Sequence, residues 1–131
     1  MTDDAKDVLK ITLFPIFLGN NHTSRRLASK LFYSTGISSL ICDKRRCALD
    51  LFAMSYRFYP LYKSCDDTLL SEQLMALSRK HSELTLLLIP TTEEYSAAVD
   101  RLTSQLEARF IITDTENLLT SPPIADMMSQ I

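Results

Sequence analysis

Short apolar runs alternate with amphipathic helical patterns along the whole chain, and this alternation most limits the folds open to it. Five runs have the length and composition of strands: residues 11–18, 38–42, 56–62, 84–89 and 110–113. The run at 84–89 is continuously apolar, as expected of a central parallel strand that is covered on both faces. The run at 56–62 is aromatic and contains Pro60, which cannot donate to a sheet ladder, so we expect it at a sheet edge.

A helix is predicted between the first and second strands and another between the second and third. The first follows the turn at residues 19–24, is capped by Thr23 or Ser24, and ends at Gly36. The second covers residues 44–54. It is expected to bury one apolar face, formed by Cys47, Ala48, Leu51 and Phe52.

Two further helices are predicted before the fourth and fifth strands. Asp66 or Asp67 is expected to cap the third helix, whose predicted buried stripe is Leu69, Leu70, Leu74 and Leu77. The fourth follows Pro90, with Thr91 as N-cap and Glu94 as the third residue of a capping box. Its predicted buried face is Tyr95, Ala98, Val99, Leu102 and Leu106.

This order of strands and helices predicts right-handed crossovers and a parallel sheet between two helical layers. The 131 residues suffice for one continuous core and not for two. We therefore predict a single α/β domain over residues 1–131, a Rossmann-like three-layer sandwich with a five-stranded, mainly parallel sheet.

Charge and composition exclude several classes of partner. The 14 Lys and Arg residues and 16 Asp and Glu residues nearly cancel, and the basic clusters are short, so nucleic acid is not expected. No apolar run reaches the roughly 20 residues that span a bilayer. Residues 1–10 are polar and resemble neither a signal nor a transit peptide, so we expect a cytoplasmic protein without membrane contact.

The three cysteines are expected to be reduced thiols, because their number is odd and no secretory signal is present. Cys42 falls in a predicted strand and Cys47 on a predicted apolar helix face, so both are expected to pack in the core. Only His22 and His81 accompany them, and the spacing fits no zinc pattern. We therefore expect no metal site.

Polar segments follow three of the predicted strands, and the carboxyl ends of parallel strands share one sheet edge. In open α/β sheets, ligands bind outside that edge, and a helix N-terminus there favours an anionic or polar ligand. We therefore predict substrate contacts from Gly19, Asn20, Asn21, Asp43, Thr91, Thr92, Glu93 and Tyr95.

The motifs of several enzyme classes are missing from these segments. Asp43 has the position of the acid that holds ribose hydroxyls in dinucleotide sites, but no second or third glycine follows Gly19. The chain also lacks a P-loop, the acidic pair of a phosphorylated receiver domain and the Gly-x-Ser-x-Gly nucleophile elbow. We predict no catalytic residue in this chain.

The same residues have structural interpretations that the sequence leaves open. Thr91 and Glu94 match a capping box, and Asn20 and Asn21 suit a turn. Asp43 suits the N-cap of the helix predicted after it. Position at the ligand-binding edge is what favours the functional interpretation.

The run Phe14-Pro15-Ile16-Phe17-Leu18-Gly19, with the polar turn and helix after it, resembles the start of ATP-grasp carboxylate-amine ligases, in particular the D-aspartate ligase-like branch. The resemblance continues at residues 86–95, where relatives have an apolar strand, a short polar turn and an aromatic residue at the helix start. It reappears at Phe110-Ile111-Ile112 and at residues 116–119, which precede the family's ATP-binding part. It covers the whole chain through the order and spacing of short motifs.

This resemblance implies the N-terminal, or pre-ATP-grasp, domain of such a ligase. In that superfamily a Rossmann-like domain packs against domains that clamp ATP and magnesium, and an amine attacks a carboxylate activated as an acyl phosphate. The chain would then form one wall of the pocket for an amino acid or amine substrate, without a cofactor of its own. Two alternatives remain: a free-standing Rossmann-like module that binds a nucleotide or small molecule, and a structural remnant that pairs with a separately encoded ATP-binding subunit.

Residues 121–131 are predicted to begin a connecting helix to an ATP-binding domain outside this chain. Ser121 and Pro122 suit a helix start, and apolar residues follow at Ile124, Met127, Met128 and Ile131. We expect this apolar face to fold back on the domain or to pair with a second copy of the chain in a homodimer.

Overall fold

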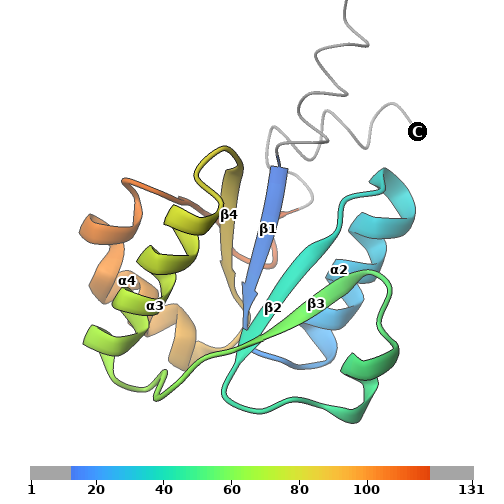
Figure 1. Cartoon of the computed structure of the whole chain (residues 1–131), viewed down its shortest axis with the longest axis horizontal. Coiled ribbons are helices and arrows are strands. Elements are labelled where there is room, and N and C mark those ends of the chain that lie inside the picture. The colour runs from blue at the N-terminus through green and yellow to red at the C-terminus, as the bar shows by residue number, and fades with distance from the viewer. Residues whose placement is uncertain (1–12, 119–131) are drawn as a thin grey trace, which may run out of the picture.

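Five strands form a single parallel sheet in the computed structural model, which describes residues 13–118 (Figure 1). The strands are β1 (Leu13–Leu18), β2 (Ser39–Asp43), β3 (Tyr56–Pro60), β4 (Thr85–Pro90) and β5 (Ile111–Ile112). Their order across the sheet is β3-β2-β1-β4-β5, and every neighbouring pair is parallel. The predicted Rossmann-like α/β sandwich is therefore confirmed, with the Pro60 strand at one edge as expected.

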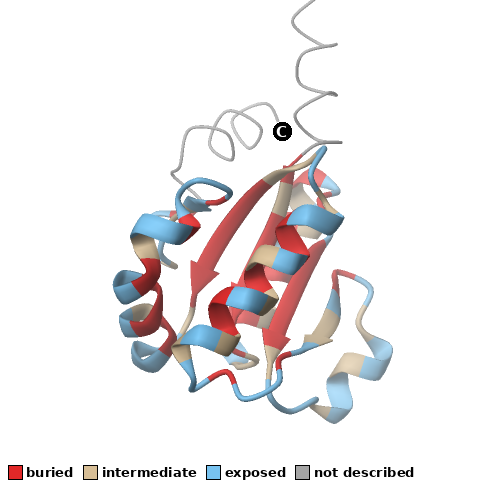
Figure 2. Ribbon diagram, turned by 60° about the vertical axis from the view of Figure 1, so that its left-hand side comes forward, coloured by how far each residue is buried: buried red, intermediate tan, exposed pale blue. Residues whose placement is uncertain are grey.

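Helices cover both faces of the sheet. Helix α2 (His22–Thr35) lies on one face, and α3 (Asp67–Lys80) and α4 (Glu93–Leu106) lie side by side on the other (Figure 1). Figure 2 shows that the central strands and the inward faces of the helices are buried, whereas the edge strands β3 and β5 are mostly half-buried or exposed. Side chains of β1 alternate between the two faces, so that Phe17 packs in the α2 core and Ile16 packs in the α3 and α4 core.

Helix α2 begins earlier than predicted. Its N-cap is Asn21, whose side chain accepts a hydrogen bond from the Ser24 backbone N–H at 2.9 Å. Ser24 completes a capping box, because its hydroxyl accepts from the Asn21 N–H at 3.0 Å. The predicted Thr23 or Ser24 cap is wrong, since Asn21 satisfies the same helix terminus three residues before Ser24. Gly36 ends the helix in the left-handed conformation, as predicted.

Helix α4 begins one residue later than predicted. Thr92 is its N-cap and accepts from the Tyr95 N–H at 3.1 Å. The predicted capping box of Thr91 and Glu94 is wrong, because the Thr91 hydroxyl donates instead to the Leu18 carbonyl in β1. The predicted buried face of this helix is confirmed in full. In α3, Asp66 is the N-cap and the predicted stripe is buried except for Leu69, which is half-buried.

The helix predicted at 44–54 is wrong. That segment holds only a short 3₁₀ helix, η1 (Ala48–Phe52), in which no residue is buried. A crossover between parallel strands needs about a dozen residues, and residues 44–55 leave little room for a full helix after the charged start Lys44-Arg45-Arg46. Cys42 is fully buried as predicted, whereas Cys47, on this connection, is only half-buried.

Two other predictions concern the connecting helix and membrane contact. The connecting helix expected at 121–131 lies outside the described residues. Between residues 13 and 118, no helix is both long enough and apolar enough to cross a membrane.

Candidate functional site

The structure brings the predicted site residues together at the carboxyl edge of the sheet. Asn20 directly follows β1, Asp43 ends β2, and Thr92 follows β4. The Asn20 backbone N–H donates to Asp43 Oδ2 at 2.7 Å, and the Thr91 N–H donates to the Leu18 carbonyl at 2.9 Å. The strand-end segments therefore form one connected surface. That these residues bind a substrate remains a prediction.

The crevice between β1 and β4 is filled by the protein's own side chains. This is the position at which the strand order reverses and at which Rossmann folds hold phosphate groups. The Thr91 hydroxyl donates to the Leu18 carbonyl at 2.8 Å and accepts from the Asn21 side-chain amide at 2.9 Å. Gly19 has φ +114°, and a side chain on it would collide with the Thr91 hydroxyl. The side-chain amide of Asn21 and the hydroxyl of Thr91 are thus already hydrogen-bonded within the protein.

Asp43 is the centre of a second hydrogen-bond group. Its carboxylate accepts from the backbone N–H groups of Asn20 and Lys44, both at 2.7 Å, and from the Tyr95 hydroxyl at 2.9 Å. The predicted helix cap is wrong, because no α-helix begins directly after Asp43. The carboxylate instead ties the ends of β1 and β2 to the start of α4.

Tyr95 acts as a buried positioning residue. Its hydroxyl lies 2.8 Å from the Ser64 hydroxyl and donates to Asp43, so Ser64 is the donor in the first contact. Burial raises the pKa of Tyr95 above its ordinary range, and the charge of Asp43 raises it further, although the Ser64 hydrogen bond opposes the shift. Tyr95 is therefore a neutral hydroxyl at physiological pH and is 6% exposed, too little to present it to a ligand.

Asn20 is held by a third group of contacts, centred on Asp50. The Asn20 amide donates to Asp50 Oδ2 at 2.8 Å and accepts from the Arg25 guanidinium at 2.8 Å. Asp50 also accepts from the Cys47 N–H and from the Tyr56 hydroxyl. Burial and this Asp50 hydrogen bond raise the pKa of Tyr56. The role of Asp50 was not predicted from the sequence, because residues 44–54 were assigned to a helix. Asp50 instead contacts Asn20, which follows β1, and Tyr56 in β3.

Two surface grooves flank the filled crevice and differ in charge. One, of about 380 Å³, is lined by Asn20 and Asp43 and by the basic run Lys44, Arg45 and Arg46. The other, of about 300 Å³, is lined by Thr92, Glu93, Asp114 and Glu116, among others. The two sides approach each other where Lys44 Nζ lies 3.9 Å from Glu94 Oε1.

Sequence analysis did not assign Asp114 or Glu116 to the site, although their position directly after the fifth strand was a usable indication. Lys44, Arg45 and Arg46 follow the second strand in the same way. Among residues 13–118, no group of three or more His, Cys, Asp or Glu side chains is placed to hold a metal ion.

The fold and the edge define a class of protein: a Rossmann-like α/β domain whose central crevice is closed and whose sheet edge carries open polar grooves on both sides of that crevice. Comparison of the chain with protein-family models, with curated proteins and with solved structures finds no match.

Proposed function

We propose that this chain is the N-terminal, pre-ATP-grasp domain of an ATP-dependent carboxylate-amine ligase, and that the carboxyl edge of its sheet forms one wall of the pocket for an amino acid or amine substrate. The sequence resemblance supports the family. One structural observation supports the role as a wall: the β1–β4 crevice is filled by Thr91 and Asn21, while charged side chains are exposed on both sides of it.

A wall explains this edge better than a complete binding site does. Small-molecule sites are concave and enclose most of the ligand surface. Here the crevice that would enclose a nucleotide phosphate is occupied by side chains, and the remaining grooves lie open on the surface. A second domain facing this edge would supply the missing enclosure, as the resemblance implies for the ATP-binding domains.

The charges of the edge suit a zwitterionic substrate. Lys44, Arg45 and Arg46 offer cations to a carboxylate, and Glu93, Asp114 and Glu116 offer carboxylates to an ammonium group. All three carboxylates are exposed, but Asp114 already accepts hydrogen bonds from Asn117. Glu93 is a candidate for direct contact, because Thr92, and not Glu93, caps α4.

The reaction of such a ligase transfers the γ-phosphoryl group of ATP to a carboxylate, and an amine then displaces phosphate from the acyl phosphate to form an amide. ATP and magnesium would be held by domains outside this chain. Residues 20, 43 and 92–93 would orient the amine or amino acid, and Asp43 and Tyr95 would fix the shape of the wall.

The test is to express the whole open reading frame that contains these residues, together with any neighbouring ATP-grasp subunit, and to assay ADP release. The assay contains Mg-ATP and a panel of amino acids and amines. The proposal expects ADP release that depends on one carboxylate and one amine, and none from residues 1–131 alone. A reading frame without an ATP-binding domain, and no ADP release with any neighbouring subunit, would overturn it.

A further inference from the structure

The connection between β2 and β3 lacks the helix that normally covers this part of a Rossmann-like sheet. Parallel strands are usually joined by an α-helix packed on the sheet. Here residues 44–55 contain only η1, which runs on the same side of the sheet as α2. The outer flank of α2, with His22, Arg26 and Tyr33, is consequently exposed to solvent.

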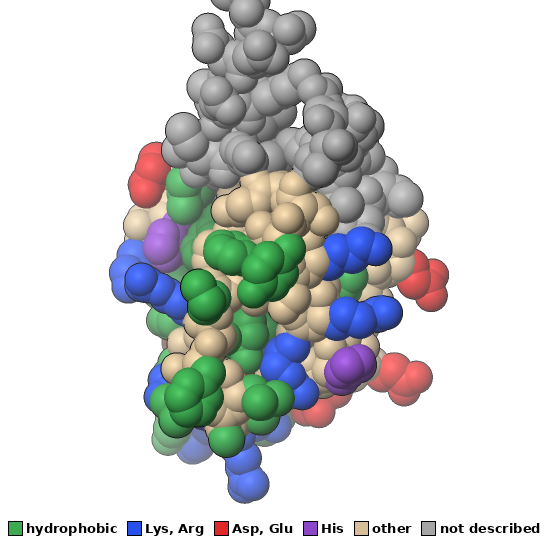
Figure 3. All heavy atoms as spheres, turned by 90° about the vertical axis from the view of Figure 1, so that its right-hand side faces the viewer, with side chains coloured by type: hydrophobic (Ala, Val, Ile, Leu, Met, Phe, Trp, Pro, Cys, Tyr) green, Lys and Arg blue, Asp and Glu red, His purple; other side chains and the backbone are tan. Residues whose placement is uncertain are grey.

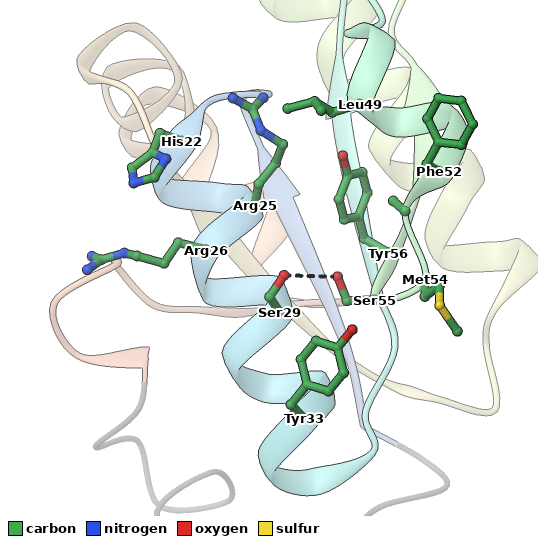
Figure 4. A pocket seen from close by; sticks show the side chains of 11 residues that line it. His22, Arg25, Arg26, Ser29, Tyr33, Leu49, Phe52, Met54, Ser55 and Tyr56 are labelled. Carbon is green, nitrogen blue, oxygen red and sulfur yellow. Dashed lines mark hydrogen bonds between the residues drawn. The ribbon is translucent and has the colours of Figure 1, made fainter.

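A groove of about 530 Å³ occupies this position. One wall is the outer face of α2, which contributes His22, Arg25, Arg26, Ser29 and Tyr33. The opposite wall is η1 and the segment leading into β3, with Leu49, Phe52 and Met54 (Figure 4). Ser29 and Ser55 face each other across the floor, with their hydroxyls 3.3 Å apart.

The apolar side chains of this groove are unusually exposed. Phe52 is 84% exposed, Met54 75% and Tyr33 76%. Figure 3 shows hydrophobic side chains gathered on this face of the molecule, with Lys, Arg and His side chains beside them. Exposed apolar side chains that line one groove and are bordered by polar residues are typical of an interaction site.

The charge of the groove is positive. Among the described residues that line it are His22, Arg25 and Arg26, and none of the lining residues is acidic. Arg25 reaches across one end toward Leu49, and His22 and Arg26 lie along the flank of α2 (Figure 4). The nearby Asp50 carboxylate is already hydrogen-bonded to Asn20, Cys47 and Tyr56. A partner with carboxylates therefore fits this rim.

We propose that the groove binds an amphipathic α-helix of a partner, with an apolar stripe against Phe52, Leu49 and Met54 and acidic residues beside Arg25 and Arg26. The α2 wall runs from His22 to Tyr33, about three helical turns or roughly 16 Å, which matches a short partner helix lying beside it. Such a helix occupies the place that a crossover helix normally takes. The proposal is independent of the ligase function.

A second copy of this chain fits the groove less well. A two-fold pairing of identical surfaces would bring two positively charged rims into one interface, and the lining of the groove holds no carboxylate that could pair with Arg25 or Arg26 of the other copy. Like charges facing each other are destabilising, whereas acidic residues on a helix complement them. The positive charge of the groove therefore favours an acidic partner helix over a second copy of the chain.

The test begins with selection of peptides from a displayed library of random sequences of about 16 residues on the immobilised 131-residue chain. The affinity of the selected peptides, made synthetically, is then measured by fluorescence anisotropy. We expect the selected peptides to have apolar residues at helical spacing and Asp or Glu beside them. Arg26→Glu and Phe52→Ser each lower their affinity about tenfold or more, as does replacing the peptide's acidic residues with Lys. Both altered residues are exposed, so the fold is retained, which circular dichroism checks.

Matched controls come from the same chain. Leu51→Ser alters another exposed apolar residue of η1, one that does not line the groove, and Arg79→Glu reverses an exposed charge on α3. Both are expected to leave the affinity within about twofold. Failure of the library to converge, a basic consensus, or selected peptides insensitive to Arg26→Glu and Phe52→Ser would overturn the proposal. The proposal would also be overturned if no peptide is selected and the chain instead binds phosphatidylserine vesicles, or associates with itself, in a way that Phe52→Ser abolishes.

Discussion

The side-chain amide of Asn21 donates a hydrogen bond of 2.9 Å to the hydroxyl of Thr91, across the junction of β1 and β4. Asn21 caps α2 with its amide oxygen, and Thr91 donates to the Leu18 carbonyl, so each side chain serves two structural contacts. This pair closes the crevice that a nucleotide-binding Rossmann domain keeps open for phosphate. It is the main reason to regard the edge as a wall.

Thr91→Ala is expected to lower the free energy of unfolding by about 1–3 kcal/mol, because it removes the bond to Leu18 and leaves the Asn21 amide without its acceptor. Urea unfolding measures the change. Thr91→Ser keeps the hydroxyl and is expected to lose much less. Equal losses for the two variants would mean that the methyl group, and not the hydrogen bonds, matters here.

Gly19→Ala is expected to destabilise the fold by about 1–3 kcal/mol, because residue 19 has φ +114° and a new Cβ meets the Thr91 hydroxyl. Combining it with Thr91→Ala removes the collision but not the backbone strain. The double variant should therefore lose less stability in urea than the sum of the two single losses. Simple additivity would contradict the predicted collision.

Tyr95→Phe is expected to cost about 1–3 kcal/mol of stability, since it removes the partner of the buried Ser64 hydroxyl and one of the hydrogen bonds that the Asp43 carboxylate accepts. Thermal unfolding followed by circular dichroism measures the change. Tyr59→Phe, which alters a half-buried tyrosine of the edge strand, is the comparison. A loss at Tyr95 no larger than at Tyr59 would contradict the positioning role.

Stability is expected to fall in alkaline solution. Burial raises the pKa values of Cys42, Tyr56 and Tyr95 in the folded protein, so the unfolded chain loses these protons at lower pH than the folded one. Their contribution is complete below the unfolded pKa, about 8.5 for Cys and about 10 for Tyr, and declines as pH rises above those values. Urea unfolding as a function of pH measures the decline, and Cys42→Ala should flatten its first part. An unchanged slope in that variant would contradict the assignment to Cys42.

In the ligase that we propose, Glu93→Ala is expected to raise the KM for the acceptor substrate about tenfold with little loss of stability, because Glu93 is exposed and Thr92 supplies the N-cap. Glu94→Ala is the matched control, since Glu94 lies in the same helical turn and does not line the groove. Steady-state kinetics of both variants gives the answer. Equal changes in KM would point to an effect on the helix N-terminus alone.

Sequence patterns predicted the sheet and the helix faces because apolar periodicity follows from burial on two faces. The α4 face from Tyr95 to Leu106 is an example. Cap positions were missed where adjacent residues are both good caps, as with Thr91 and Thr92, since the choice depends on the Leu18 carbonyl in another strand. The helix at 44–54 was predicted wrongly because its apolar spacing is helical, although Leu51 and Phe52 are in fact 68% and 84% exposed.

The gathering of Asn20, Asp43 and Thr92 at one edge was predictable from strand direction alone. The closure of the crevice was not, because it depends on the contact of Asn21 with Thr91, two side chains far apart in the sequence. The roles of Asp50 and Arg25 likewise depend on how the β2–β3 connection folds back on Asn20. Tertiary hydrogen bonds of this kind leave no local pattern.

Calorimetric titration of the 131-residue chain with Mg-ATP tests most directly the claim that this domain supplies a wall and not a nucleotide site. The filled β1–β4 crevice and the absence of a phosphate-binding glycine loop predict no measurable binding at micromolar ATP. A dissociation constant in the micromolar range for this chain alone would contradict the claim and favour a free-standing nucleotide-binding module.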